Sequence, residues 1–131
     1  MRTILALLAV AAAAPAFAPG SITKETVKID RDPRAYYLFV PDTLGPEPAP
    51  VVITLYGSGR DGKPLVELFR DLATNERIIV VGPDATDRRG WQVPVDGPSF
   101  LYFLIEAVKA KHASTDAAST CSVFRPAHRS R

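Results

Sequence analysis

The stretch from Pro50 to Pro64 constrains the fold of this chain more than any other part of the sequence. It reads P-V-V-I-T-L-Y-G-S-G-R-D-G-K-P, so a run of apolar and β-branched residues leads directly into a glycine-rich turn. A strand with one exposed face would alternate apolar and polar residues, whereas an unbroken run predicts a strand buried on both faces. The glycines allow a sharp turn with bare amide N–H groups, which can hold an anion or a developing oxyanion. We therefore expect any chemistry of this chain to lie at this turn.

The residues before this stretch predict an antiparallel hairpin. Apolar and polar side chains alternate in T-V-K-I-D at residues 26–30, and A-Y-Y-L-F-V at residues 35–40 has the composition of a strand. The sequence D-R-D-P at residues 30–33 predicts a turn between them. Residues 41–50 contain four prolines and are expected to form a surface loop.

A helix and a second buried strand are predicted after the glycine turn. Pro64 suits the first turn of a helix that ends near Asn75. The apolar stripe predicted for this helix follows the i, i+3, i+4, i+7 pattern and consists of Leu65, Leu68, Phe69 and Leu72. Residues 78–81 are again continuously apolar, and strand, helix and strand in this order predict a parallel α/β unit.

A second helix is predicted to start near Asp96 or Ser99 and to end near Lys111, after a charged loop at residues 84–95. Its inner side is predicted to consist of Leu101, Leu104, Ile105 and Val108. Residues 112–131 have no apolar periodicity and are expected to be irregular, although an α/β chain should supply a strand there.

The first eighteen residues predict export. An early Arg, an apolar run from Ile4 to Ala14 and the ending Ala16-Phe17-Ala18 are typical of a secretory signal peptide. The run is shorter than the roughly 20 residues that span a bilayer, so a secreted or periplasmic protein without a membrane anchor is expected. The net charge of +2 gives no reason to expect nucleic acid or an anionic membrane as a partner.

The glycine turn has two chemical interpretations. Residues 57–62 match G-x-G-x-x-G, the pattern of dinucleotide-binding turns. Three features oppose a dinucleotide site. Export removes the chain from nucleotide pools, and Pro64 begins the helix only after the third glycine. The pattern also needs an acidic residue at the end of the next strand, and Asp84 lies beyond that position. The favoured alternative is an oxyanion hole formed by the backbone N–H groups of Gly57, Ser58 and Gly59.

Five motifs occur in order between residues 34 and 111. They are Y-Y-L-F-V-P at 36–41, V-V-I-T-L-Y-G-S-G-R-D-G at 51–62, V-V-G-P-D-A at 80–85, R-G-W-Q at 89–92 and S-F-L-Y-F-L-I at 99–105. Together they resemble the N-terminal half of secreted α/β-hydrolases of the esterase, poly(hydroxyalkanoate) depolymerase and feruloyl esterase type. The resemblance implies a serine hydrolase that acts on small or polymeric carboxylic esters without a cofactor. Where this family usually has a His after the strand, this chain has Tyr56.

The resemblance also implies residues that the chain lacks. The family carries its catalytic Ser in a G-x-S-x-G turn after the next strand, with Asp and His later in the chain. No G-x-S-x-G occurs in the 131 residues, and the only histidines are His112 and His128. We therefore expect an incomplete α/β-hydrolase domain at residues 19–111 that is inactive alone. The family's strand order places the missing strand beside residues 51–56, which predicts an open sheet edge and poor solubility.

A single-base frameshift is our hypothesis for residues 112–131. If the last base of each codon from His112 onward joins the first two bases of the next, codon degeneracy permits a peptide close to R-V-D-R-R-G-V-Y-L-F-G-x-S-A-G-A. That peptide would supply both the missing strand and the missing nucleophile turn.

Other features have simpler interpretations. Trp91 either lines a substrate pocket, as the family resemblance implies, or pins a loop. Asp84 and Asp87 alone are too few ligands to predict a metal site. Cys121 is the only cysteine, so no intrachain disulfide can form. A small secreted binding module, with Trp91 and the tyrosines forming a surface for carbohydrate or protein, remains the alternative function.

Overall fold

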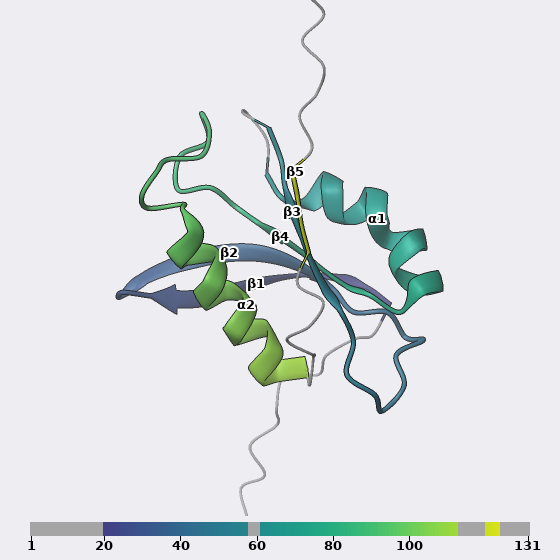
Figure 1. The fold of residues 1–131 in the computed structure, drawn as a ribbon. Helices are drawn as coiled ribbons and strands as arrows, with labels where there is room; N and C mark the ends of the chain where they lie inside the picture. Colours follow the sequence, from purple (N-terminus) through teal and green to yellow (C-terminus); the bar gives the residue numbers. More distant parts are fainter. Residues whose placement is uncertain (1–19, 58–60, 113–119, 124–131) are drawn as a thin grey trace, which may run out of the picture.

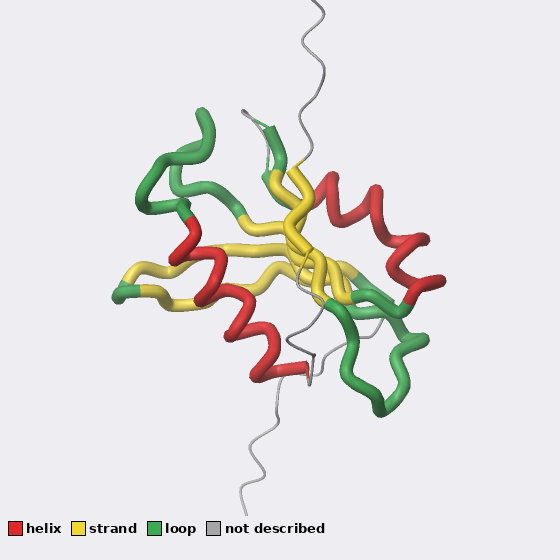
Figure 2. The backbone as a smooth tube through the Cα atoms, in the orientation of Figure 1, coloured by secondary structure: helices red, strands yellow, loops and turns green. Residues whose placement is uncertain are grey.

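The chain forms a mixed five-stranded sheet between two helices. The computed structural model describes residues 20–57, 61–112 and 120–123. The strands and helices are, in chain order, β1 (Ile22–Ile29), β2 (Asp32–Phe39), β3 (Val51–Leu55), α1 (Lys63–Glu76), β4 (Ile79–Pro83), α2 (Pro98–His112) and β5 (Thr120–Val123). The strand order across the sheet is β1-β2-β4-β3-β5 (Figure 1). Figure 2 shows the two helices on opposite sides of the strands, with the loop from β4 to α2 at one end.

The predicted hairpin is confirmed, and its turn is as short as a hairpin turn commonly gets. Ile29 pairs with Asp32 in the antiparallel register of β1 and β2, which leaves only Asp30 and Arg31 as the turn. Both have positive φ angles, 49° and 77°. Positive φ at both central residues gives a turn whose twist matches that of the two strands. The hairpin therefore fixes the backbone of Asp30 at the end of the sheet.

The predicted buried parallel pair is also confirmed. β3 and β4 pair in parallel, with Val51 opposite Ile79 and Ile53 opposite Val81. Strand β4 also pairs with β2 on its other side, so neither edge of β4 is free. The apolar side chains of β4 are all nearly inaccessible: Ile79 is 0%, Val80 2% and Val81 0% exposed. A strand with neighbours on both sides and helices on both faces requires this continuous apolar sequence.

The predicted buried stripe of α1 is only partly confirmed: Phe69 packs against the core and Leu65 is half-buried, but the fully buried residues are different ones. The helix buries Val66 and Ala73, whereas Leu68 is 68% and Leu72 is 50% exposed. The close approach of the helix start to β4 sets the rotation of α1. A Cβ on Gly82 would lie 2.5 Å from Val66 Cγ2, so the Val66 side chain lies directly on the backbone of β4. This contact turns the leucines toward solvent.

The prediction for α2 is largely confirmed. The helix buries Phe100, Leu104 and Val108, while Leu101 and Ile105 are partly buried against the same core. These residues cover the face of the sheet opposite α1, whose own core contains Phe39, Val66, Ala73 and Val80. In the described part of the chain, no helix is long and apolar enough to cross a membrane.

The expectation that residues 112–131 contribute no strand is wrong. Residues 120–123 form β5, which pairs in parallel with β3 from Val52 to Leu55. The family strand order placed the missing strand at this edge, and β5 occupies it. Thr and Val favour extended backbone, and a neighbouring strand satisfies the backbone groups of the short T-C-S-V segment. The argument for an open edge beside β3 therefore no longer holds.

Replacing Gly62 with Ala should strongly destabilise the fold. A Cβ on Gly62 would lie 2.1 Å from the carbonyl oxygen of Gly82, and backbone cannot move aside as a side chain can. Because Gly62 has helical φ and ψ angles of −71° and −19°, the effect is steric and not conformational. We expect Gly62→Ala to lower the free energy of unfolding by at least about 2 kcal/mol in urea denaturation.

Gly45→Ala is the matched control, because a Cβ at Gly45 meets nothing within 4 Å. Its free energy of unfolding should stay within about 0.5 kcal/mol of the parent. Equal effects of the two substitutions would contradict the close approach of α1 to β4.

Candidate functional site

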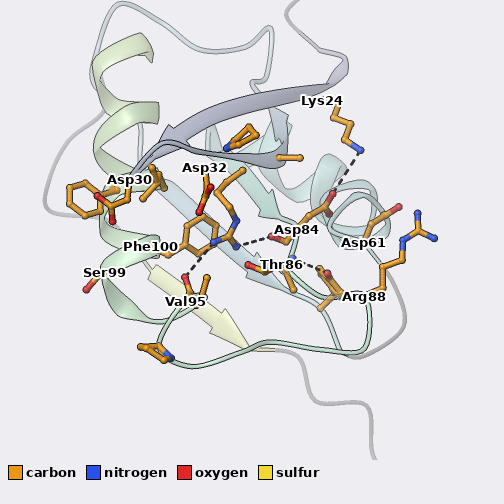
Figure 3. Close-up of a pocket in the computed structure, with 18 residues that line it drawn as sticks. Lys24, Asp30, Asp32, Asp61, Asp84, Thr86, Arg88, Val95, Ser99 and Phe100 are labelled. Atoms are coloured by element: carbon orange, nitrogen blue, oxygen red, sulfur yellow. Dashed lines mark hydrogen bonds and ion pairs between the residues drawn. The ribbon is translucent and has the colours of Figure 1, made fainter.

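A cavity of about 1030 Å³ lies at the end of the sheet where β4 ends and β2 begins. Its lining comes from four segments: the β1–β2 turn, the turns after β3 and β4, and the start of α2 (Figure 3). β2 is antiparallel to β4, with Tyr36 opposite Pro83, so the start of β2 lies beside the end of β4. The topology therefore brings loops distant in sequence to one place, as at the carboxyl ends of strands in other α/β sheets.

A buried ion pair organises the loop on one side of this cavity. The Arg34 guanidinium in β2 donates to Asp96 Oδ1 at 2.5 Å, and the two side chains are 9% and 0% exposed. The guanidinium also donates to the carbonyl oxygens of Asp84 and Val95 at 3.3 Å each. It lies 3.7 Å from the ring centroid of Phe100 in α2, in cation–π geometry. One side chain thus joins β2, both ends of the loop and α2.

The Asp96 carboxylate receives several donors besides Arg34. The N–H of Gln92 donates to Oδ2 at 2.8 Å, and the hydroxyl of Thr86 donates to Oδ1 at 2.7 Å. Burial by itself would raise the pKa of the Asp96 carboxyl. The hydrogen bonds from Gln92 and Thr86, together with the Arg34 charge, outweigh burial and leave that pKa below its ordinary value. Asp96 is therefore an ionised, fully paired group at neutral pH.

Tyr56, the last residue before the glycine turn, is held at both of its polar groups. Its hydroxyl accepts a hydrogen bond from Ala85 N–H at 2.9 Å, and its carbonyl oxygen accepts one from Trp91 Nε1 at 2.7 Å. The Tyr56 and Trp91 rings also lie 5.3 Å apart at 52°. Burial raises the pKa of Tyr56, so its hydroxyl stays protonated. Tyr56 thus links the turn after β3 to the loop after β4 through its hydroxyl, its carbonyl and its ring.

The predicted site residues divide into described and undescribed positions. Gly57 directly follows Tyr56 and is half-buried, whereas Ser58 and Gly59 lie outside the described residues. Trp91 is not among the residues that line the cavity, and its indole N–H pins the loop to Tyr56. Tyr36 is 1% exposed and does not line the cavity, whereas Tyr56 is 6% exposed and forms part of its lining.

The acidic residues after β4 have structural partners. Asp84 Oδ1 accepts a hydrogen bond from Gly62 N–H at 2.9 Å, and Asp84 Oδ2 lies 3.9 Å from Lys24 Nζ. Asp87 pairs with Arg89 at 2.8 Å within an exposed turn. Within residues 20–57 and 61–112, no group of three or more His, Cys, Asp or Glu side chains is placed to hold a metal ion.

His112 lies away from this cavity. It is the last residue of α2, whereas the cavity is lined by Ser99, Phe100 and Phe103 from the first turns of that helix. A helix of this length separates its two ends by about 20 Å. Burial, followed by the charge of Lys111, lowers the pKa of His112. His128 lies outside the described residues.

Sequence reasoning missed Arg34 and Asp96, the two residues that organise the site. Asp96 stands two residues before the first residue of α2, and its position suggested only a helix start. Arg34 stood between the predicted turn and strand without any pattern that would mark it as buried. Their separation of 62 residues leaves no local signal of their pairing.

Comparison with solved structures supports the fold over part of their length. Similar structures include the acetyl xylan esterase from Aspergillus awamori (17% identity, TM-score 0.68, covering 79% of this chain and 42% of that one). They also include the poly(3-hydroxybutyrate) depolymerase from Bordetella parapertussis, which is 16% identical with a TM-score of 0.65. That match covers 79% of this chain and 42% of the depolymerase. A third similar structure is the S-formylglutathione hydrolase from Agrobacterium tumefaciens, which is 16% identical with a TM-score of 0.59. That match covers 78% of this chain and 47% of the hydrolase. No protein-family model and no curated protein sequence matches the chain.

These comparisons confirm the predicted fold. The described part of the chain has the fold of a part of the α/β-hydrolases, and the chain spans less than half the length of these three structures.

Removing the negative charge of Asp96 should destabilise the fold and change its pH dependence. A carboxyl with a lowered pKa in the folded state stabilises the protein above its unfolded pKa, about 3.9, and loses this contribution as the pH falls through the folded pKa. Asp96→Asn, which leaves Arg34 buried without its counterion, should cost about 3–5 kcal/mol at neutral pH. Its stability should then fall less steeply than the parent's below about pH 4.

Urea denaturation followed by the fluorescence of Trp91, the only Trp, measures both effects. Asp42→Asn is the control, because Asp42 is exposed in the loop after β2. If Asp96→Asn retained the full acid dependence of the parent, the assignment of that dependence to Asp96 would be wrong.

Proposed function

We propose that this chain is the N-terminal portion of a serine hydrolase that acts on carboxylic esters. In this proposal, the backbone N–H groups around Gly57, Ser58 and Gly59 stabilise the oxyanion of the tetrahedral intermediate. The similar structures include an acetyl xylan esterase, a poly(3-hydroxybutyrate) depolymerase and an S-formylglutathione hydrolase. Esters, small or polymeric, are accordingly the substrate class that we propose for the complete enzyme.

The observation that carries the proposal is the way Trp91 holds the peptide unit between Tyr56 and Gly57. In a trans peptide the C=O and N–H point in opposite directions. The indole N–H of Trp91 binds the Tyr56 carbonyl oxygen at 2.7 Å, so the Gly57 N–H is directed away from Trp91. Fixing this direction in advance is what an oxyanion donor requires, because a preorganised dipole costs no reorganisation during the reaction. Trp91 is thus a positioning residue in the proposed site.

In its present reading frame, the sequence does not encode the nucleophile turn of a serine hydrolase. In the family, the nucleophile turn follows the strand that pairs beside β3, and that place in the sheet belongs here to β5. The alternative frame from His112 onward would encode both a strand and G-x-S-x-G. We propose that residues 112–131 are the out-of-frame product of this segment.

The reading-frame hypothesis makes a direct prediction about activity. The 131-residue chain should not hydrolyse p-nitrophenyl acetate above the rate of the heat-denatured chain. A gene with the reading frame corrected by one base near codon 112, and with its downstream sequence, should give a protein that does. Ser→Ala in the restored G-x-S-x-G should then reduce kcat by at least about 10⁴-fold.

Two outcomes would contradict the proposal. One is a downstream DNA sequence in which no frame encodes G-x-S-x-G. The other is turnover by the 131-residue chain that only a substitution at Ser58 abolishes. Trp91→Phe in the corrected protein tests the positioning role, because it keeps the ring and removes the N–H. It should lower kcat with little change in KM.

We also propose that the chain is exported and loses residues 1–18. The support is the charged start, the apolar run and the small-x-small ending of this segment. Expression in a bacterial host should yield a periplasmic or secreted product with Pro19 at or near its N-terminus, as measured by intact mass. Ala16→Lys and Ala18→Lys should block cleavage, and a product that keeps Met1 in the cytoplasm would contradict the proposal.

A further inference from the structure

The cavity beside Arg34 has an apolar wall that is more exposed than a core would be. Phe100 forms its inner part and is only 3% exposed, whereas Phe103 is 49% and Val95 is 56% exposed. Pro94 and Ile29 extend this wall. Large apolar side chains that remain half-exposed along a cavity indicate a surface that is covered when the cavity is occupied. An occupant of this wall needs an apolar body.

The charges around the cavity are not balanced. Its lining includes four acidic residues, Asp30, Asp32, Asp61 and Asp84, and three basic residues, Lys24, Arg34 and Arg88. Arg34 is paired with Asp96, and Lys24 lies beside Asp84. Asp30, Asp32 and Asp61 have no basic side chain within ion-pair distance in the described part of the chain. Among the basic residues of the lining, Arg88 is the one without an ion pair inside the cavity, while the charge of Lys24 acts on Asp61 as well as on Asp84.

The imbalance is greatest at the end of the cavity that also carries the aromatic wall. Figure 3 shows Asp30 and Asp32 on the side of Ser99 and Phe100, whereas Arg88 lies with Asp61 at the other end. Asp30 is held there by the two-residue turn of the hairpin, and Asp32 is the first residue of β2. The carboxylates of the hairpin therefore lie on the aromatic side of the cavity, and no ion pair joins them to a basic side chain within residues 20–57 and 61–112.

We propose that this end of the cavity binds an organic cation with an aromatic or alkyl body. The apolar body would cover Phe103 and Val95, and the positive charge would lie toward Asp30 and Asp32. An organic ammonium group is larger and more weakly hydrated than a metal ion, so it loses less hydration free energy here, and its carbon substituents contact the apolar wall. Anionic compounds would be repelled by the same carboxylates. The inference does not depend on the proposed hydrolase activity, because binding requires no nucleophile.

Titration of the full chain with benzyltrimethylammonium, followed by backbone amide chemical shifts in NMR, tests this site. The aromatic cation should bind saturably, with the largest shifts at residues 29–34 and 95–103. Benzyl alcohol, which is neutral, should bind at least about fivefold more weakly, since each carboxylate contributes a few tenths to 1 kcal/mol at a half-exposed site. Phenylacetate, which is anionic, should cause no saturable shifts.

The double variant Asp30→Asn/Asp32→Asn removes both negative charges of the hairpin and nearly preserves the size of the two side chains. Asn tolerates the positive φ of residue 30, so the turn should persist. The variant should lose about fivefold to tenfold in affinity for the cation and keep the parent's weaker affinity for benzyl alcohol. Asp42→Asn, remote from the cavity, is the matched control and should bind the cation as the parent does. The unperturbed part of the amide spectrum reports whether each variant is folded.

Three results would overturn the inference. They are equal affinity for the cation and benzyl alcohol, unchanged cation affinity in the double variant, and chemical-shift changes that map away from the hairpin and α2. Any of them leaves the proposed hydrolase function unaffected, because that proposal is tested by turnover after correction of the reading frame.

Discussion

The buried ion pair between Arg34 and Asp96 is the interaction on which the functional end of the molecule depends. Its partners come from both ends of the loop from β4 to α2, which Tyr56 holds separately through Ala85 and Trp91. A carboxylate that accepts from Gln92 and Thr86 as well as Arg34 is saturated with donors, so its desolvation is compensated. The pair fixes one wall of the cavity, the place of Phe100 and the direction from which Trp91 reaches Tyr56.

A second constraint joins this end of the sheet to α1. Gly62 and Gly82 allow the helix start to touch the backbone of β4, and the N–H of Gly62 donates to Asp84. The third glycine of the G-x-G-x-x-G pattern is therefore explained by packing, without a nucleotide. Asp84, which directly follows β4, is paired with the helix start and with Lys24. Gly62 and Asp84 thus both have structural roles that require no dinucleotide.

Much of the fold could be predicted from sequence because its signals are local. The hairpin turn, the two continuous apolar strands and the inner face of α2 each follow from patterns within a few residues. The rotation of α1 could not be predicted, because Leu65, Leu68, Phe69 and Leu72 form as good a stripe as the one that is buried. The contact of Gly62 with Gly82, 20 positions away, decides between them. Strand β5 was missed for a similar reason: T-C-S-V is extended through pairing with β3.

Residues of the candidate site could be predicted only where they belong to a recognisable sequence motif. Gly57 and Trp91 could be named because each stands in a motif, but their relation through the Tyr56 carbonyl is visible only in three dimensions. That relation also explains how Tyr56 can stand where the resembling family has His. Its hydroxyl holds the start of the loop after β4 through Ala85, and its carbonyl holds the middle of that loop through Trp91. The geometry of the turn after β3 thus depends on contacts within residues 34–96, most of them between residues far apart in the sequence.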